Sequence, residues 1–242
     1  MNPISDQVAV VTGAGSGIGK AIALALALKG ATLALVGRRI APLESVVELA
    51  RGAGVVAQAF PNDLAREDEV RNLGARIKGE LVQADILVHC AAIAHMGTVA
   101  EASAEVLDQH YQTNLRGPYL LTQALLPLLK LRRGQIVFMN SSAGLDARAN
   151  VAQYAASQHA LKAIADSLRE EINRDGIRVL SVFPGRTATP MQQELHVLEG
   201  RPYHPERLLE PEEVAEVVVH ALCLPRTAEV TEIKIRPMLK WD

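Results

Sequence analysis

The chain has 242 residues, 49% of them hydrophobic and 21% charged, which suits one α/β domain with a full core and leaves little for a second. A formal net charge of −2 and a content of only one Trp, four Tyr and three Phe argue against a surface for nucleic acid or an anionic membrane. Cys90 and Cys223 have no metal-ligand spacing, so we expect no metal site and two reduced thiols in a cytoplasmic protein. Residues 1–6 show no signal-peptide pattern, and no apolar run is long enough to span a bilayer.

Strand and helix patterns alternate along the whole chain. Short apolar, β-branched runs predict strands at residues 7–12, 32–36, 55–60, 85–88, 135–140, 177–183 and 230–235. Helical patterns cover residues 18–29, 42–50, 66–78, 104–131, 152–173 and 211–222, with an interruption near Gly117-Pro118. Such alternation requires βαβ crossovers. We therefore expect a doubly wound, mostly parallel sheet with helices on both faces, a Rossmann-like α/β fold that forms a single domain over residues 1–242.

Residues 186–210 form the one long segment without a clear period. The segment contains Pro190, Pro202 and Pro205 and charges of both signs. Segments that follow the carboxyl edge of a sheet are commonly lids or binding loops. We expect an irregular substrate loop here, with residues 94–96 as a second contributor to specificity.

A glycine-rich turn follows the first expected strand. Residues 12–19 read Thr-Gly-Ala-Gly-Ser-Gly-Ile-Gly and lead straight into a helix. Glycines let the backbone approach a pyrophosphate, which the free N–H groups at the helix start stabilise. The alternative is a turn that only packs the helix on the sheet, and the N-terminal strand–turn–helix context favours dinucleotide binding. A nucleoside-triphosphate loop is excluded, because Gly19-Lys20 is followed by Ala21 rather than Ser or Thr.

The end of the second expected strand bears on which dinucleotide binds. NAD enzymes place an acid there for the adenosine ribose, whereas this chain has Gly37-Arg38-Arg39. Two guanidinium groups suit a 2′-phosphate, so we expect NADP(H) to be preferred and NAD(H) to remain possible. The alternative is a pair of solvated surface arginines. Asp63 either accepts a hydrogen bond from the adenine amino group or caps the following helix.

Taken together, these motifs resemble the short-chain dehydrogenase/reductase superfamily, in its shorter single-domain subclass. The resemblance rests on Thr12-Gly-x-x-x-Gly17-x-Gly19, Asp63-Leu64, Asn114-Leu-x-Gly117, Ser141 with Tyr154 thirteen residues later, and Pro184-Gly185 with Thr189. It implies a catalytic set of Asn114, Ser141, Tyr154 and Gln158. The implied cofactor-binding set is Gly13, Ser16, Gly17, Ile18, Gly19, Arg38, Arg39, Asp63, Leu64, Ala91, Ala92, Tyr154, Gln158, Pro184, Gly185, Thr187 and Thr189.

Two departures from the family pattern bear on activity. The family's Asn-Asn-Ala-Gly stands here as His89-Cys90-Ala91-Ala92, and its Tyr-x-x-x-Lys ends in Gln158. In carbonyl reduction, Tyr154 can protonate the oxygen while Ser141 donates a hydrogen bond to it. The resemblance implies that Asn114 holds a water in the proton relay.

A lysine at position 158 would bind the ribose and lower the pKa of Tyr154, and Gln158 keeps only the first of these roles. Alcohol oxidation, which needs the phenolate, should suffer more than carbonyl reduction. Lys162 and His159 are badly placed on the helix to substitute, and His89 is expected to be a hydrogen-bonded core residue rather than a site residue.

Two functions follow from these features. The first is an NADP-dependent oxidoreductase that acts on a small carbonyl or alcohol. The alternative is a non-catalytic NAD(P)-binding regulator or sensor, which Gln158 favours. The helices at 104–131 and 152–173 carry apolar residues on more than one face, so we expect a homodimer or homotetramer.

Overall fold

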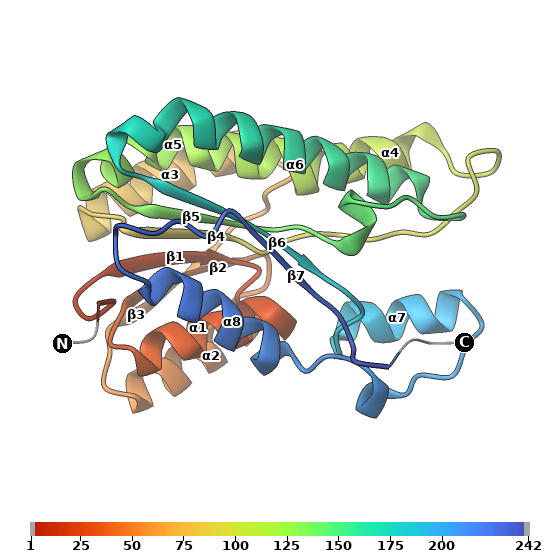
Figure 1. The fold of residues 1–242 in the computed structure, drawn as a ribbon, viewed down its shortest axis with the longest axis horizontal. Coiled ribbons are helices and arrows are strands. Elements are labelled where there is room, and N and C mark those ends of the chain that lie inside the picture. The colour runs from red at the N-terminus through yellow and green to blue at the C-terminus, as the bar shows by residue number, and fades with distance from the viewer. Residues whose placement is uncertain (1–2, 240–242) are drawn as a thin grey trace.

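The computed structural model describes residues 3–239 and contains a seven-stranded parallel sheet in the order β3-β2-β1-β4-β5-β6-β7 (Figure 1). The strands are β1 Val8–Thr12, β2 Thr32–Gly37, β3 Ala57–Pro61, β4 Ile86–His89, β5 Gln135–Met139, β6 Arg178–Pro184 and β7 Glu232–Ile235. Met1 and Asn2, at the start of the segment without a signal-peptide pattern, lie outside the described residues. The strand order reverses between β1 and β4, and such a reversal opens a crevice at the carboxyl ends of the strands.

Helices cover both faces of this sheet (Figure 1). On one face lie α1 Gly17–Leu28, α2 Ile40–Gly52 and α8 Pro211–Cys223, and on the other α3 Glu67–Leu81, α4 Ala104–His110, α5 Gly117–Arg132 and α6 Ala152–Ile172. A further helix, α7 Pro190–Leu198, lies beyond the carboxyl ends of the strands. The doubly wound α/β architecture expected from the sequence is confirmed.

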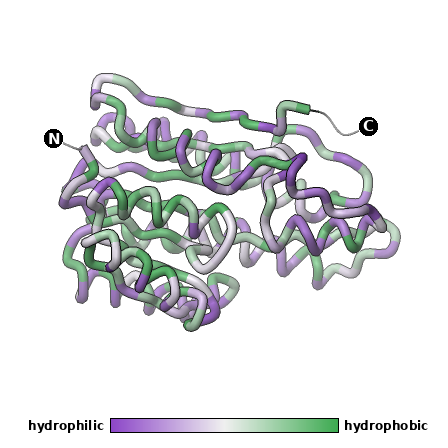
Figure 2. The backbone as a smooth tube through the Cα atoms, turned by 90° about the horizontal axis from the view of Figure 1, so that it is seen from below, coloured by the Kyte–Doolittle hydropathy of each residue, from purple (hydrophilic) through white to green (hydrophobic). Residues whose placement is uncertain are grey.

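The alternation of side chains along the strands divides the core into two layers. Ala9 and Val11 of β1 pack with α1, α2 and α8, whereas Val10 packs with α3, α5 and α6. All five residues of β1 are buried, because a central parallel strand is covered on both faces. The helices alternate between hydrophobic and hydrophilic residues along their length (Figure 2), as expected for helices with one face on a sheet. Among residues 3–239, no helix is long and apolar enough to cross a membrane.

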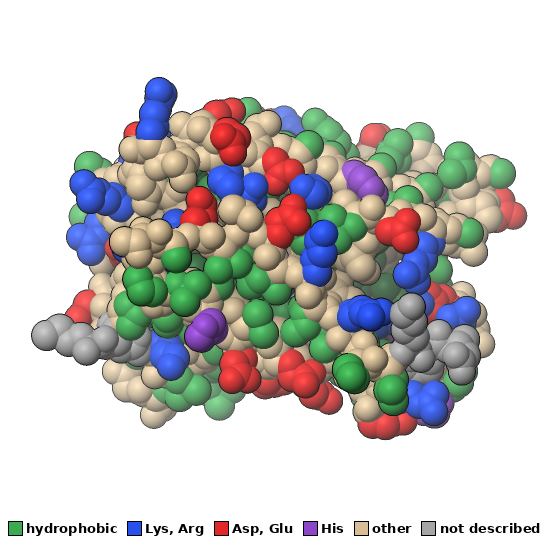
Figure 3. Space-filling model, viewed as in Figure 1, with side chains coloured by type: hydrophobic (Ala, Val, Ile, Leu, Met, Phe, Trp, Pro, Cys, Tyr) green, Lys and Arg blue, Asp and Glu red, His purple; other side chains and the backbone are tan. Residues whose placement is uncertain are grey.

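Positive and negative side chains are interspersed on the face seen in Figure 3, without a continuous field of one sign. Many of the charged groups form ion pairs along helices, such as Arg71 with Glu67 and Arg76 with Glu80 on α3. Exposed pairs of this kind contribute little to stability, because the solvent screens them.

The structure refines one expectation about local structure and corrects another. The interruption expected near Gly117-Pro118 is a π-helix at Tyr111–Arg116 between α4 and α5, and Gly117-Pro118 begin α5. Pro118 is compatible with that place because the first turn of a helix needs no N–H donor from it. The segment 186–210 is also not irregular, because α7 and a short 3-10 helix at Pro205–Arg207 lie within it. Thr189 caps α7 by accepting a hydrogen bond from the Gln192 N–H at 3.2 Å, and Pro190 is its first residue.

Candidate active site

A cavity of about 350 Å³ opens at the carboxyl ends of the strands. It is enclosed by the glycine-rich turn, the ends of β2 to β6, the segment after β6 and the inner face of α7. The sequence-predicted residues that line it are Gly13, Ser16, Gly17, Ile18, Gly19, Arg38, Arg39, Asp63, Leu64, Ala91, Ala92, Ser141, Tyr154, Pro184, Gly185, Thr187 and Thr189. A volume of this size suits a small ligand site.

The glycine turn needs glycine at two positions for clear steric reasons. Gly13 has a φ of +68°, and a Cβ there would lie 2.8 Å from the backbone N of Ala91. A Cβ on Gly19 would lie 2.4 Å from the carbonyl oxygen of Gly13. Both distances are impossible for real atoms, so glycine allows the turn to fold back on itself and to meet the segment after β4. Thr12 fixes the same junction, because its hydroxyl oxygen accepts from the N–H groups of Cys90 at 3.0 Å and Ala91 at 3.1 Å.

The start of α1 fits an anion. Its N-cap residue, Ser16, makes no side-chain capping hydrogen bond, and its first turn contains no acidic residue. The N–H groups of that turn, at Gly17, Ile18 and Gly19, belong to residues that line the cavity. Unpartnered N–H groups at the positive end of a helix dipole bind phosphate groups. The residues present therefore fit the pyrophosphate of a dinucleotide.

Asp63 does not cap the following helix. The N-cap of α3 is Arg66, and the Asp63 carboxylate accepts a hydrogen bond from the Ala65 N–H at 3.0 Å instead. Asp63 lines the cavity together with Arg38 and Leu64. Its carboxylate therefore keeps acceptor capacity for a group within the cavity.

Ser141 and Tyr154 meet at the cavity wall. The Ser141 oxygen accepts from the Ala143 N–H at 3.1 Å, which leaves its hydroxyl hydrogen to donate. Burial raises the pKa of Tyr154, and a hydrogen bond from Ser141 acts in the opposite direction without cancelling the rise. Burial also raises the pKa of the neighbouring Cys90 thiol to about 12. The site therefore holds a protonated phenol, a hydroxyl donor and a neutral thiol at neutral pH.

Asn114 and Gln158 do not line the cavity, although the family resemblance placed both in the catalytic set. Asn114 is 1% exposed, and its carboxamide accepts from the Ile93 N–H at 2.8 Å and donates to the Ile93 carbonyl at 2.9 Å. Gln158 is also 1% exposed, and its side-chain oxygen is buried without a hydrogen-bond partner. An orphaned buried acceptor is costly. Because Gln158 does not line the cavity, the ribose contact implied by the family resemblance is not seen in the structure.

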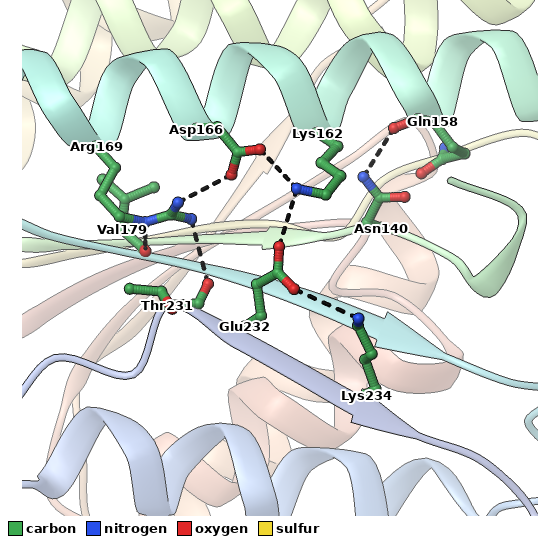
Figure 4. A network of polar contacts seen from close by, with 9 residues as sticks. All are labelled: Asn140, Gln158, Lys162, Asp166, Arg169, Val179, Thr231, Glu232 and Lys234. Carbon is green, nitrogen blue, oxygen red and sulfur yellow. Dashed lines mark hydrogen bonds and ion pairs between the residues drawn. The ribbon is translucent and has the colours of Figure 1, made fainter. Parts of the chain in front are cut away.

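No cation within residues 3–239 replaces the missing lysine. Burial lowers the pKa of His89 to about 3, and its Nε2 lies 2.8 Å from the Thr122 hydroxyl, so it is a neutral core residue as expected. Figure 4 shows that Lys162, one turn beyond Gln158, points away to Asp166 and Glu232, with contacts of 2.6 and 2.9 Å. These two carboxylates raise the pKa of Lys162 and hold its charge outside the cavity.

Several cavity residues were not named individually from the sequence, and two of them make contacts that hold the site together. Asn140 accepts from the Ser141 N–H at 2.7 Å and donates to the Gln158 carbonyl at 2.9 Å. It thereby joins the serine segment to α6. Arg186 lines the cavity and forms a bidentate pair with Glu199 at 2.9 and 2.7 Å, which ties the far end of α7 to β6. The position of Asn140 directly before Ser141 was an available signal, whereas the Arg186 pair depends on how α7 folds back.

Together, a doubly wound sheet, a glycine turn at its switch point and a serine–tyrosine pair in the same cavity define a class: a dinucleotide-dependent oxidoreductase. The chain belongs to the short-chain dehydrogenase family, whose model matches residues 7–198. The family resemblance seen in the sequence is thereby confirmed, and the chain is an NAD(P)-dependent short-chain dehydrogenase/reductase.

Similar proteins match almost the whole chain. An uncharacterised oxidoreductase of Staphylococcus epidermidis is 33% identical over 239 residues, which cover 98% of this chain and 100% of that protein. The alcohol dehydrogenase of the archaeon Thermococcus sibiricus, solved with 5-hydroxy-NADP, is 28% identical with a TM-score of 0.89, covering 98% of this chain and 99% of its own. A metagenomic short-chain oxidoreductase solved with NADP is 30% identical with a TM-score of 0.85, and the match covers 98% of this chain and 99% of that protein's chain.

Proposed function

We propose that this protein is an NADP(H)-dependent reductase of a small carbonyl compound, with Tyr154 as the proton donor. The observation that carries this proposal is the placement of Ser141 and Tyr154 at the wall of the same cavity as the glycine turn. A carbonyl oxygen in reach of both hydroxyl groups would receive a hydrogen bond from Ser141 and a proton from Tyr154. Residues 186–210, through α7, would cover the substrate.

The cofactor preference rests on Arg38 and Arg39. Both are exposed and line the cavity at the end of β2, where an acid would serve NAD. Their guanidinium groups would pair with a 2′-phosphate, and two similar proteins of known structure carry NADP or a derivative of it. When bound, the dihydronicotinamide supplies the hydride, and the glycine turn with the start of α1 would hold the pyrophosphate.

The direction of the reaction follows from the protonation state of Tyr154. Reduction needs the neutral phenol, which the raised pKa of Tyr154 provides at neutral pH. Oxidation needs the phenolate as the base, and no described cation stabilises it. The site therefore favours carbonyl reduction over alcohol oxidation.

A second candidate is a nucleotide-binding regulator without turnover. One observation favours it: the position of the expected lysine is occupied by a buried, uncharged side chain, Gln158. Such a protein would bind NADP(H) with the same residues, and Tyr154 would transfer no proton.

A single set of measurements separates the two candidates. NADPH affinity is measured by fluorescence, and NADPH consumption is measured across a panel of aldehydes and ketones. The reductase predicts turnover that falls by about a hundredfold or more in Tyr154→Phe while the variant still binds NADPH. Leu28→Ala, an exposed change on α1, is the control. Tight NADPH binding with no turnover on any carbonyl would favour the regulator.

A further inference from the structure

His110 is a buried histidine at the end of α4 that the proposed chemistry does not use. The side chain is fully buried. Its Nδ1 lies 2.7 Å from the carbonyl oxygen of Val106, and its Nε2 lies 3.0 Å from the backbone nitrogen of His95. A carbonyl oxygen only accepts and a backbone N–H only donates. The two contacts therefore fix a neutral imidazole with its proton on Nδ1 and an acceptor at Nε2.

The contact at Nε2 belongs to a series along one backbone segment. Residues 93–97 run from the end of β4 past the cavity towards the start of α6. Asn114 holds both the N–H and the carbonyl of Ile93, His110 holds the N–H of His95, and the Asn150 carbonyl holds the N–H of Gly97 at 2.9 Å. Each of the alternate residues 93, 95 and 97 is thus held by a backbone hydrogen bond to a group outside the segment.

This segment forms one wall of the cavity. Ile93 and Ala94 line it, and the residues on either side of Ala94 are the two that Asn114 and His110 hold. His110 and Asn114 stand four positions apart across the junction of α4 with the π-helix, so they present side chains to the same segment. The wider π-helical turn at Tyr111–Arg116 is a feature that often accompanies functional sites.

His110 also lies close to the proposed proton donor. The centroid of its ring lies 6.0 Å from that of Tyr154, with the planes at 57°, and 5.3 Å from the ring of His95, edge on. The histidine therefore bridges the wall segment on one side and α6 on the other.

We propose that His110 is a positioning residue that fixes the His95 end of this wall and so sets the substrate side of the cavity beside Tyr154. The inference rests on the proposed carbonyl reduction, because it assigns Ile93 and Ala94 to the substrate rather than to the cofactor. His110 touches no reacting atom and acts through the backbone that it holds.

The acceptor at Nε2 exists only while the imidazole is neutral. Burial lowers the pKa of His110, the hydrogen bond to Val106 raises it in part, and the side chain of His95 adds to the lowering. Among residues 3–239, the titratable side chains recorded against the ring are His95 and Tyr154, and the Tyr154 phenol on α6 is neutral at acid pH. On acidification below the lowered pKa, a second proton at Nε2 would oppose the N–H of His95 and release that end of the wall.

Three variants test the assignment. His110→Phe keeps a ring against Tyr154 and removes the acceptor, His110→Gln restores an acceptor that does not titrate, and Gln112→Ala is an exposed control in the same helical turn. Hydrogen exchange of the His95 amide is followed by NMR, together with KM for a turned-over carbonyl and the dissociation constant of NADPH, from about pH 5 to 8.

The proposal predicts slow exchange of the His95 amide in the wild type, His110→Gln and Gln112→Ala. In His110→Phe we expect faster exchange and a KM raised by about tenfold, with kcat and NADPH affinity changed by less than about twofold. The wild type should lose amide protection and gain KM at acid pH, and His110→Gln should not.

Equal protection of the His95 amide in the wild type and His110→Phe would overturn the proposal, as would a raised KM in His110→Gln equal to that of His110→Phe. If the wild type turns over no carbonyl at all, the proposed reduction fails. The amide exchange and its acid dependence still decide the role of His110 in that case.

Discussion

Replacing Gln158 by Lys should restore a phenolate-stabilising charge beside Tyr154. The two positions are four residues apart on α6, so their Cβ atoms lie roughly 5–6 Å apart on one helix face. A unit charge about 4 Å from the phenolate at an effective dielectric of about 20 contributes about 4 kcal/mol, or about three pKa units. Burial raises the pKa of Tyr154 in the native protein, so the phenolate forms only at alkaline pH, and the added lysine would move that titration to lower pH.

The structure indicates that the lysine can be accommodated. The Gln158 carbonyl, which accepts from Asn140 at 2.9 Å, is backbone and stays in place. A Cβ on Gly144 would come within 3.1 Å of the Gln158 Cβ. The lack of a side chain at Gly144 therefore leaves room for the side chain at position 158. The carboxylates of Asp166 and Glu232 are already paired with Lys162 (Figure 4) and would not neutralise the new charge.

The assay is a pH series of initial rates in both directions on any substrate that turns over. For Gln158→Lys we expect the rising, acid-side limb of the pH–rate profile for alcohol oxidation to move down by about three pH units, with a smaller gain in carbonyl reduction. Gln158→Met, which has a similar length and no charge, is the control and should show no shift. An unchanged oxidation profile in the lysine variant, or the same shift in the methionine variant, would refute the electrostatic argument.

Three further predictions follow from the site and the surface. Replacing both Arg38 and Arg39 by Ala should weaken NADP⁺ binding by about tenfold to a hundredfold and leave NAD⁺ affinity within about threefold; equal losses for both nucleotides, measured by titration, would contradict a 2′-phosphate site. In Glu199, burial raises the pKa but the hydrogen bonds from Arg186 lower it further, so the net pKa is lowered; the contribution of this pair is present above the ordinary carboxyl pKa of about 4.5 and is lost as the pH falls through the lowered value. Glu199→Gln should therefore make α7 more sensitive to limited proteolysis at neutral pH, and the wild type should approach the variant only in acid. Light scattering at micromolar concentration should give the mass of a dimer or tetramer, since exposed apolar side chains such as Leu107 and Leu131 lie on α4 and α5; a monomer mass would contradict this.

The sequence was sufficient to predict the sheet, the two helical layers and the glycine turn, because each depends on short-range patterns. Buried parallel strands such as β1 are apolar at every position but the last, Thr12, and the period of two or 3.6 residues appears in any window of about ten. About half of the residues that line the cavity were also predicted from sequence, since a doubly wound sheet brings the ends of its strands to one edge. Gly13 and Thr189, which are far apart in the chain, both line the cavity for that reason.

Only the tertiary structure decided what the buried polar groups do. The sequence placed Asn114 and Gln158 in the catalytic set, but contacts with residues distant in the chain turn Asn114 towards Ile93 and leave the oxygen of Gln158 unpartnered. The tautomer of His110 likewise follows from a contact with His95, fifteen residues away. Periodicity records which side chains are buried, whereas hydrogen-bond partners depend on the three-dimensional approach of separate elements. For that reason the sequence determined the class of protein, and the packing of α4, the π-helix and α6 decided how its cavity is built.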